Sequence, residues 1–132
     1  MVIDTSAIVA ILRKEREHLD FTYLITSANL RLISAATVLE TATVLEARFG
    51  ESVGREFDEF LLDAQIVIIN VDRGQVEVAR TAWRKYGKGR HRAALNFGDC
   101  FVYALAKVKG EPGLAKGNDF RLTDIEMCAT GR

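Results

Sequence analysis

The sequence lacks the features of a membrane or exported protein. Its longest uninterrupted apolar runs, such as Ala7–Leu12, are far too short to cross a bilayer. Its first residues, MVIDTS, have neither the basic start nor the apolar stretch of a signal peptide. We therefore expect a cytoplasmic protein that has no membrane partner.

Cysteine is scarce and net charge is zero. The two cysteines, Cys100 and Cys128, lie in apolar stretches and have neither the paired spacing of a zinc site nor the density of a disulfide-stabilised fold. We expect both to be reduced and structural. Equal numbers of basic and acidic residues, 18 of each, argue against a protein that coats nucleic acid nonspecifically, although local clusters of one sign remain compatible with this balance.

The chain has enough apolar sequence for one hydrophobic core. With 132 residues, 48% of them hydrophobic and 27% charged, it is long enough for one compact domain and hardly for two. We therefore expect a single domain over residues 1–132.

Short apolar runs typical of strands alternate with longer segments of helical period. The expected strands are Met1–Ile3, Leu30–Ile33, Ile66–Val71 and Gly113–Lys116, with a weaker candidate at Ile125–Cys128. The expected helices are Ser6–Leu12, Glu15–Ala28, Ala35–Phe49, Val53–Ala64, Gly74–Tyr86 and Asn96–Val108. The expected N-caps are Ser34 and Asp72, and the expected C-terminal caps are Gly50, Gly87 and Gly110. This alternation predicts an α/β fold with a mostly parallel sheet of four to five strands and helices on both faces.

Acidic residues are expected at one edge of this sheet. In open α/β sheets, ligands bind beyond the carboxyl ends of the strands. Asp4 and Asp119 directly follow expected strands. Glu40 and Asp99 lie in the second and the first turn, respectively, of expected helices. We therefore expect all four carboxylates to reach the same edge.

Three of these acids also have an ordinary structural interpretation. Asp4 would cap the helix that follows it. Asp99 lies three residues after Asn96, an expected helix cap, where an acid favours the positive end of the helix dipole. Asp119, in KGND, would serve in a turn. The sequence alone leaves both interpretations open.

Glu40 is harder to explain as an ordinary surface residue. On a helical wheel it lies about 80° from the stripe of Thr37, Thr41 and Arg48, which we interpret as the solvent-facing side. Acids that converge without basic partners repel one another, so a bound cation is expected. Oxygen ligands without His or Cys at ligand spacing favour Mg²⁺ or Mn²⁺ over zinc.

A basic segment leads into Asp99. Residues 81–97, TAWRKYGKGRHRAALNF, contain no acid. We interpret four side chains here as contacts for RNA phosphates, with a solvated loop as the alternative: Arg84, Lys88, Arg90 and Arg92. Trp83 and Tyr86 are three residues apart, which favours the buried stripe of their helix over stacking on bases.

These segments resemble a known family. MVIDTSA, Glu40 in ATVLETATVLEARFG, GKGRHRAALNFGDCFVYALAK and KGNDF are similar to the motifs of PIN-domain nucleases, and closely to those of the VapC toxins of bacterial toxin–antitoxin pairs. The resemblance covers essentially the whole chain. It implies a PIN-like three-layer α/β/α sandwich in which Ser6 lies beside an acidic metal-binding quartet formed by Asp4, Glu40, Asp99 and Asp119.

The same resemblance implies a function. It predicts an endoribonuclease that uses Mg²⁺ or Mn²⁺, forms a homodimer and is inhibited by a cognate VapB-type antitoxin. A metal ion held by carboxylates can activate a water molecule and neutralise charge on phosphate oxygens, which suits RNA hydrolysis. The alternative is a PIN-like module that binds RNA or protein without catalysis. A phosphatase-type site is disfavoured because it needs a second Asp where this chain has Ser6.

One segment departs from the family pattern. The strand before KGNDF is usually bulky and apolar in VapC toxins, whereas this chain has Gly113, Leu114 and Ala115. Losing two large side chains would weaken the packing of this strand by a few kcal/mol, at about 25 cal/mol per Å² of apolar surface, unless neighbours compensate. The position of Asp119 depends on this strand.

Overall fold

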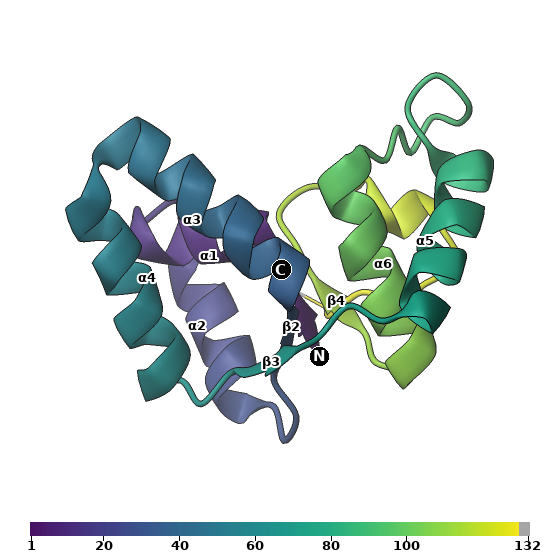
Figure 1. The fold of residues 1–132 in the computed structure, drawn as a ribbon. Coiled ribbons are helices and arrows are strands. Elements are labelled where there is room, and N and C mark those ends of the chain that lie inside the picture. The colour runs from purple at the N-terminus through teal and green to yellow at the C-terminus, as the bar shows by residue number, and fades with distance from the viewer. Residues whose placement is uncertain (130–132) are drawn as a thin grey trace.

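The structure is a computed structural model that describes residues 1–129 (Figure 1). Within these residues, one parallel sheet of four strands has the order β3-β2-β1-β4. The strands are β1 Val2–Ile3, β2 Leu32–Ser34, β3 Val67–Ile69 and β4 Gly113–Leu114. Along the chain, β2 and then β3 are added on one side of β1, and β4 pairs with the other side of β1. The switch point that favours ligand binding in such sheets therefore lies between β1 and β4.

Helices cover both faces of the sheet. They are α1 Thr5–Leu12, α2 His18–Ser27, α3 Ala35–Phe49, α4 Glu51–Asp63, α5 Arg73–Tyr86 and α6 Phe97–Lys109, with a 3₁₀ turn, η1, at Phe120–Leu122. Figure 1 shows α1 to α4 on one side of the strands and the α5–α6 pair on the other. The predicted three-layer α/β/α architecture is confirmed.

Two apolar cores lie on the two faces of the sheet. Val2 and Leu32 pack into the core under α5 and α6, whereas their neighbours Ile3 and Ile33 pack into the core under α1 to α4. This division follows from the two-residue repeat of a strand, which sends successive side chains to opposite faces. A parallel sheet covered on both faces therefore needs apolar residues at every strand position.

Most predicted boundaries are confirmed within a few residues. Ser34 and Asp72 accept a hydrogen bond from the backbone N–H of the first turn of α3 and α5, as an N-cap should. α2 begins at His18 rather than at Glu15, because Lys14 has a φ of +52° and the chain turns there before the helix starts. The predicted strand at Ile125–Cys128 is reduced to one isolated parallel bridge between Gly113 and Met127.

The segment after η1 compensates for the small residues of β4. The Gly113 N–H donates to the carbonyl of Glu126, and the Cys128 N–H donates to the carbonyl of Gly113. A side chain at position 113 would begin 2.9 Å from Sδ of Met127, so that Met127 occupies the space a larger residue would take. Leu114 remains buried. The expected loss of packing therefore does not occur, because residues far along the chain fill the gap.

Two further expectations concern the cysteines and the membrane. Both cysteines are free, Cys100 buried and Cys128 half-buried, and burial raises the pKa of each thiol. In the part of the chain that the structure describes, no helix combines the length and apolar character that a membrane span requires.

Candidate metal centre

Asp4 lies at the end of the central strand and caps the helix that follows. Its Oδ2 accepts hydrogen bonds from the backbone N–H of Ser6 at 3.0 Å and from the Ser6 hydroxyl at 2.6 Å. Only 6% of the residue is exposed. Burial raises the pKa of Asp4, the two Ser6 hydrogen bonds lower it, and the charge of Glu40 raises it further. Asp4 is therefore a cap whose negative charge is unfavourably buried.

Ser6 connects Asp4 to the chain beyond β4. Its hydroxyl donates to Asp4 and accepts a hydrogen bond from the backbone N–H of Lys116 at 2.9 Å. The Lys116 side chain is anchored separately, since its Nζ lies 2.9 Å from Oε1 of Glu15. Ser6 thus joins the carboxyl ends of β1 and β4, on the segment that leads to Asp119.

Glu40 points from α3 toward α1. Its Oε1 accepts a hydrogen bond of 2.6 Å from the Thr5 hydroxyl, and Oγ1 of Thr5 lies 2.9 Å from Oγ1 of Thr41. Thr37 and Thr41 are buried, so our interpretation of them as solvent-facing was wrong, whereas Arg48 is exposed as expected. The physical reason is that the Thr41 hydroxyl donates to the carbonyl of Thr37 at 2.7 Å, which satisfies it inside the protein.

Asp99 is a helix cap, as one interpretation of the sequence predicted, and it also interacts with the charges of the other three carboxylates. It lies in a reciprocal capping box, in which the Asp99 N–H donates to Asn96 Oδ1 at 2.9 Å and the Asn96 N–H donates to Asp99 Oδ2 at 3.0 Å. Burial raises the pKa of Asp99 to about 6, against the hydrogen bond from Asn96. The charges of Asp4, Glu40 and Asp119 contribute smaller parts of this rise in pKa. Asp99 is therefore a helix cap within reach of three other carboxylates.

Asp119 differs from the other three acids in its surroundings. It precedes η1, is exposed and makes no capping hydrogen bond to the turn. Its charge nevertheless contributes to the raised pKa of Asp99. We refer to Asp4, Glu40, Asp99 and Asp119 together as the acidic quartet.

The acidic quartet is suited to a hard divalent cation by its chemistry. Its ligand atoms are all carboxylate oxygens, which Mg²⁺ and Mn²⁺ prefer. Among residues 1–129, no three His, Cys, Asp or Glu side chains are grouped tightly enough to form a ready-made metal site. Asp4, Glu40 and Asp99 each direct one carboxylate oxygen at a hydrogen-bond donor of the protein. A cation would have to compete with these donors.

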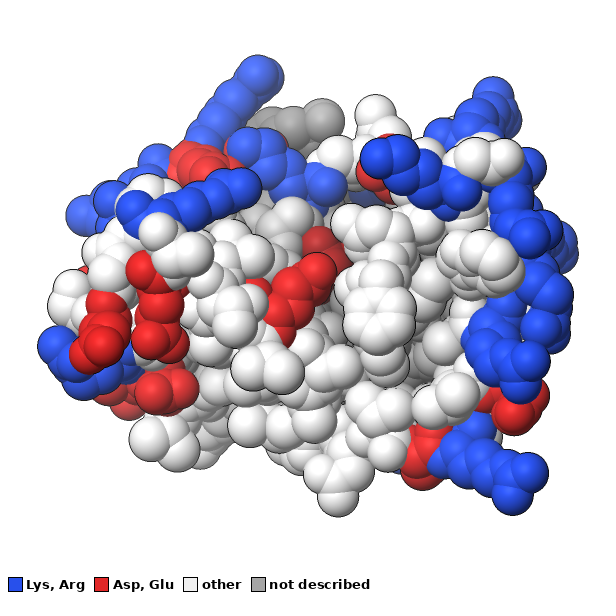
Figure 2. All heavy atoms as spheres, turned by 45° about the horizontal axis from the view of Figure 1, so that its top comes forward, with Lys and Arg blue, Asp and Glu red and all other residues white. Residues whose placement is uncertain are grey.

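The acidic quartet lies beside a hollow in the surface. Figure 2 shows a small group of acidic atoms in a depression between the two halves of the molecule, with uncharged surface on either side and basic side chains along the rim. A groove of about 520 Å³ runs between α3 and α6 and is lined by Glu40, Asn96, Phe97 and Gly98 among others. Of the acidic quartet, Glu40 lines this groove.

The basic segment lies at the end of α5 and in the loop that leads to α6. Arg84, Lys88, Arg90 and Arg92, which we refer to as the basic quartet, are all exposed. Within the described residues, none of the four forms an ion pair. The structure therefore leaves these cations available to an anionic partner.

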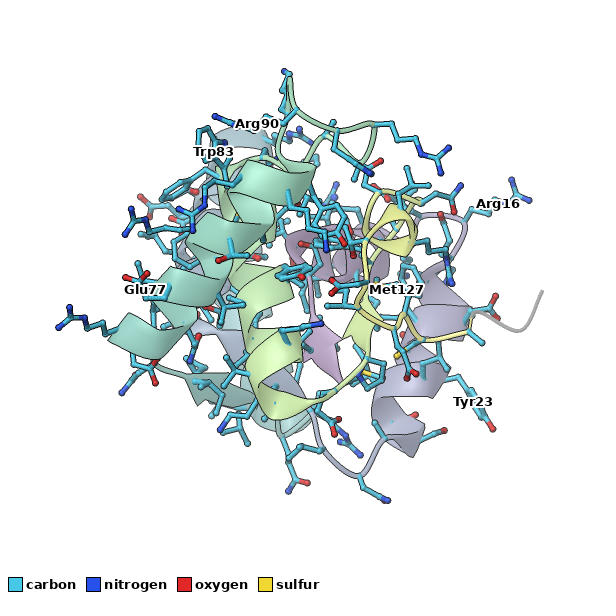
Figure 3. All side chains as sticks on the ribbon, turned by 90° about the vertical axis from the view of Figure 1, so that its right-hand side faces the viewer. Arg16, Tyr23, Glu77, Trp83, Arg90 and Met127 are labelled. Carbon is cyan, nitrogen blue, oxygen red and sulfur yellow. The ribbon has the colours of Figure 1, made fainter. Side chains whose placement is uncertain are left out.

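Trp83 corrects one prediction about this segment. Tyr86 is buried as expected, but 47% of Trp83 is exposed, so Trp83 does not belong to the buried stripe. The guanidinium of Arg90 lies 4.2 Å from the centre of the Trp83 ring, and Figure 3 shows both residues at the same end of α5. This cation–π contact partly covers the indole from the side of the loop.

Sequence reasoning missed two residues that contact Glu40. Thr5 stands between Asp4 and Ser6 and donates to the Glu40 carboxylate. Gly98, directly before Asp99, packs its backbone against the same carboxylate. The sequence offered a signal for both, since each is the immediate neighbour of a predicted ligand. For Gly98 there was a second signal, because glycine is unfavourable inside a helix.

Known proteins resemble this chain over nearly its whole length. The PIN domain family matches residues 1–126. The chain is 53% identical to ribonuclease VapC30 of Mycobacterium tuberculosis over 129 residues, which are 98% of each chain. The crystal structure of M. tuberculosis VapC20, a sarcin–ricin loop cleaving toxin, aligns with a TM-score of 0.78 at 22% identity over 96% of this chain and 97% of that one. VapBC2 from Rickettsia felis, solved with a fragment of its promoter DNA, gives a TM-score of 0.73 at 16% identity over 96% of each chain.

Proposed function

From the premise that this chain belongs to the PIN domain family, as an endoribonuclease of the VapC toxin group, we propose that the acidic quartet binds Mg²⁺ or Mn²⁺ for RNA hydrolysis. One observation carries the proposal. Glu40 contacts both Thr5, the neighbour of Asp4, and Gly98, the neighbour of Asp99. These two contacts support the proposal because they place the Glu40 carboxylate against the residues that adjoin Asp4 and Asp99 in the sequence.

Each carboxylate has a distinct part in the proposal. Asp4, Glu40 and Asp99 hold the ion, and Ser6 fixes the orientation of Asp4 through its 2.6 Å hydrogen bond. The ion supplies an activated water and neutralises charge on the phosphate oxygens. Asp119 is exposed and makes no capping hydrogen bond, so it is free to orient the attacking water and accept its proton as well as to complete the ligand set.

The basic quartet holds the substrate in this proposal. RNA carries one negative charge per phosphate, and exposed cations that form no ion pair within the protein neutralise such charges at little cost. Arg84 lies in the last turn of α5, and Lys88, Arg90 and Arg92 lie in the loop that enters α6, the helix that carries Asp99. Phosphates bound there lead the RNA strand toward the carboxylates.

We further propose two protein partners, acting in the cytoplasm. A second copy of the chain would cover the apolar surface beside the acidic quartet, where Leu39 is 67% exposed and Phe97 81% exposed. A VapB-type antitoxin would inhibit the nuclease by placing a cationic segment against the carboxylates. The VapBC2 structure supports this pairing through its shared fold.

Cleavage of a fluorogenic single-stranded RNA tests the proposed function. We expect cleavage with Mg²⁺ or Mn²⁺, none in excess EDTA, and none from Asp4→Asn with either ion. Asp58→Asn, which neutralises an exposed carboxylate on α4, is the matched control and should cleave normally. RNA binding without cleavage under all conditions would favour the noncatalytic module instead.

A further inference from the structure

Glu40 is held by hydroxyl groups rather than by a basic side chain. Thr5 Oγ1 donates to Glu40 Oε1 at 2.6 Å and lies 2.9 Å from Oγ1 of Thr41. A hydroxyl has one proton, and the Thr5 proton is directed at the carboxylate. The Thr41 hydroxyl donates its own proton to the carbonyl of Thr37 at 2.7 Å, so Thr5 is at most a second acceptor for that proton. Thr5 is thus the donor that holds Glu40.

Gly98 provides space for the other oxygen of Glu40. A Cβ at position 98 would lie 2.7 Å from Cδ of Glu40 and 2.9 Å from Oε1, and closer still to Oε2. These distances are too short for any real side chain. Gly98 is the second residue of α6 and does not have the positive φ that would itself require glycine. A side chain at this position would therefore have to displace the Glu40 carboxylate.

Another glycine of the same chain lacks this constraint. Gly74 is the second residue of α5, and a Cβ there would meet only Oδ1 of Asp72, at 3.5 Å, which is an ordinary contact. The two glycines occupy equivalent helix positions. They differ in whether a carboxylate from another helix lies against the backbone.

We propose that Thr5 and Gly98 are positioning residues that together set the Glu40 carboxylate between the first turns of α1 and α6. Thr5 holds one oxygen by a hydrogen bond, and Gly98 leaves room for the carboxylate beside Asp99. The consequence for metal binding rests on the proposed function. The positioning itself does not, because it follows from contacts within the protein.

A thermal-unfolding cycle in EDTA tests the part played by Gly98. Alanine is the better helix former, so Gly98→Ala should raise Tm wherever nothing obstructs the new methyl group. We expect no rise in the wild-type background, where Glu40 must be displaced, and a clear rise in the Glu40→Ala background. Gly74→Ala should raise Tm equally in both backgrounds. An equal rise for Gly98→Ala in both would overturn the proposal.

Metal affinity tests the part played by Thr5. Thr5→Val keeps the shape of the side chain and removes the hydroxyl, whereas Thr5→Ser keeps the hydroxyl. Loss of a group that orients a metal ligand typically weakens affinity by about 10–100-fold, so we expect a loss of this size for Thr5→Val and for Gly98→Ala, and recovery for Thr5→Ser. The measurement is calorimetric titration with Mn²⁺.

The controls separate this inference from the proposed function. Thr26→Val removes an exposed hydroxyl on α2 and should leave Mn²⁺ affinity unchanged. A Kd for Thr5→Val within twofold of wild type would overturn the role of Thr5. If the wild type itself binds no Mn²⁺, the proposed function fails, and the unfolding cycle alone still decides whether Glu40 requires Gly98.

Discussion

The acidic and basic quartets place opposite charges in opposite environments. Asp4 and Asp99 are buried or half-buried, hydrogen-bonded and raised in pKa, and Glu40 is held by Thr5. The basic quartet is exposed and, within residues 1–129, has no acidic partner. Asp4, Glu40 and Asp99 are thus held by hydrogen bonds before anything binds, whereas the side chains of the basic quartet are held by few contacts.

The two environments predict different contributions to metal binding and to RNA binding. Buried carboxylates of one sign destabilise the protein, and a divalent cation reverses that cost, so their effects should be large and mutually dependent. Exposed cations gain little from the fold and interact with phosphates through a screened field. Substitutions of these cations should therefore have smaller effects on RNA binding, which should be roughly additive and sensitive to salt.

Asp4→Asn should have the largest effect. The substitution keeps the size of the side chain but removes a charge from the most buried member of the acidic quartet. Loss of a residue that merely orients a metal ligand typically costs about 10–100-fold. We expect the rate of RNA cleavage to fall by more than this. Single-turnover cleavage at saturating Mg²⁺ measures this, and a loss of tenfold or less would place Asp4 outside the metal site.

Neutralising the basic quartet to Gln should have the next largest effect. The salt dependence of RNA affinity should weaken by a slope of about 0.7 for each phosphate of a single strand that the variant no longer neutralises, while Mn²⁺ affinity stays unchanged. Fluorescence anisotropy over a series of salt concentrations gives the slope. A matched pair compares Arg90→Gln/Arg92→Gln with Arg73→Gln/Lys109→Gln, at the far ends of α5 and α6. Equal slopes for the two pairs would show the basic quartet to be ordinary solvated surface.

Asp99→Asn should change stability in a pH-dependent manner. The pKa of Asp99 is raised from 3.8 to about 6 in the folded protein, so the folded state binds more protons than the unfolded state between these values. Proton binding by Asp99 therefore stabilises the folded wild type fully below pH 3.8, and this stabilisation is lost as the pH rises through 6. Asn retains an oxygen for the Asn96 N–H and carries no charge. In EDTA at pH 7.5 we expect the variant to be more stable than wild type by about 1 kcal/mol, after allowance for solvent screening.

Urea unfolding at pH 4 and pH 7.5 checks this sign. The advantage of the variant should appear at the higher pH and shrink at the lower one. If Asp99→Asn is instead less stable at pH 7.5 by about 0.3–1 kcal/mol, the size of a missing charge–dipole interaction, Asp99 acts only as a cap.

The Arg90–Trp83 contact should have the smallest effect. An exposed cation–π pair contributes about 0.5–1 kcal/mol, so Arg90→Gln should lower the free energy of unfolding by no more than this. A double-mutant cycle with Trp83→Leu measures the pair by urea unfolding. A coupling energy near zero would show that the Trp83 contact does not stabilise the protein. Arg90 would then differ still more from the hydrogen-bonded carboxylates of the acidic quartet.

The sequence predicted the features that depend on local signals. Strand and helix order, the caps at Ser34 and Asp72 and the capping box at Asn96 and Asp99 follow from residues within one turn of each other. The position of Asp4 at the carboxyl end of β1 also followed from the sequence, whereas the metal site of the acidic quartet stays a prediction.

Features that depend on distant residues were not predictable in the same way. The space at Gly98 is set by Glu40, and the space at Gly113 is set by Met127, which comes from another part of the chain. Thr41 was misread because periodicity counts threonine as polar, although its hydroxyl can bond to the preceding helical turn and be buried. In each case a contact through space decides what a pattern along the chain leaves open.

Direct titration of Mn²⁺ into the wild type and Asp4→Asn, at pH 7.5 and pH 5.5, tests the central claim that the acidic quartet binds a divalent cation. The account predicts binding to the wild type at pH 7.5, weaker binding at pH 5.5 because Asp99 with its pKa of about 6 must release a proton, and little binding to Asp4→Asn at either pH. Equal affinity in the two proteins, or no binding to the wild type at pH 7.5, would contradict it.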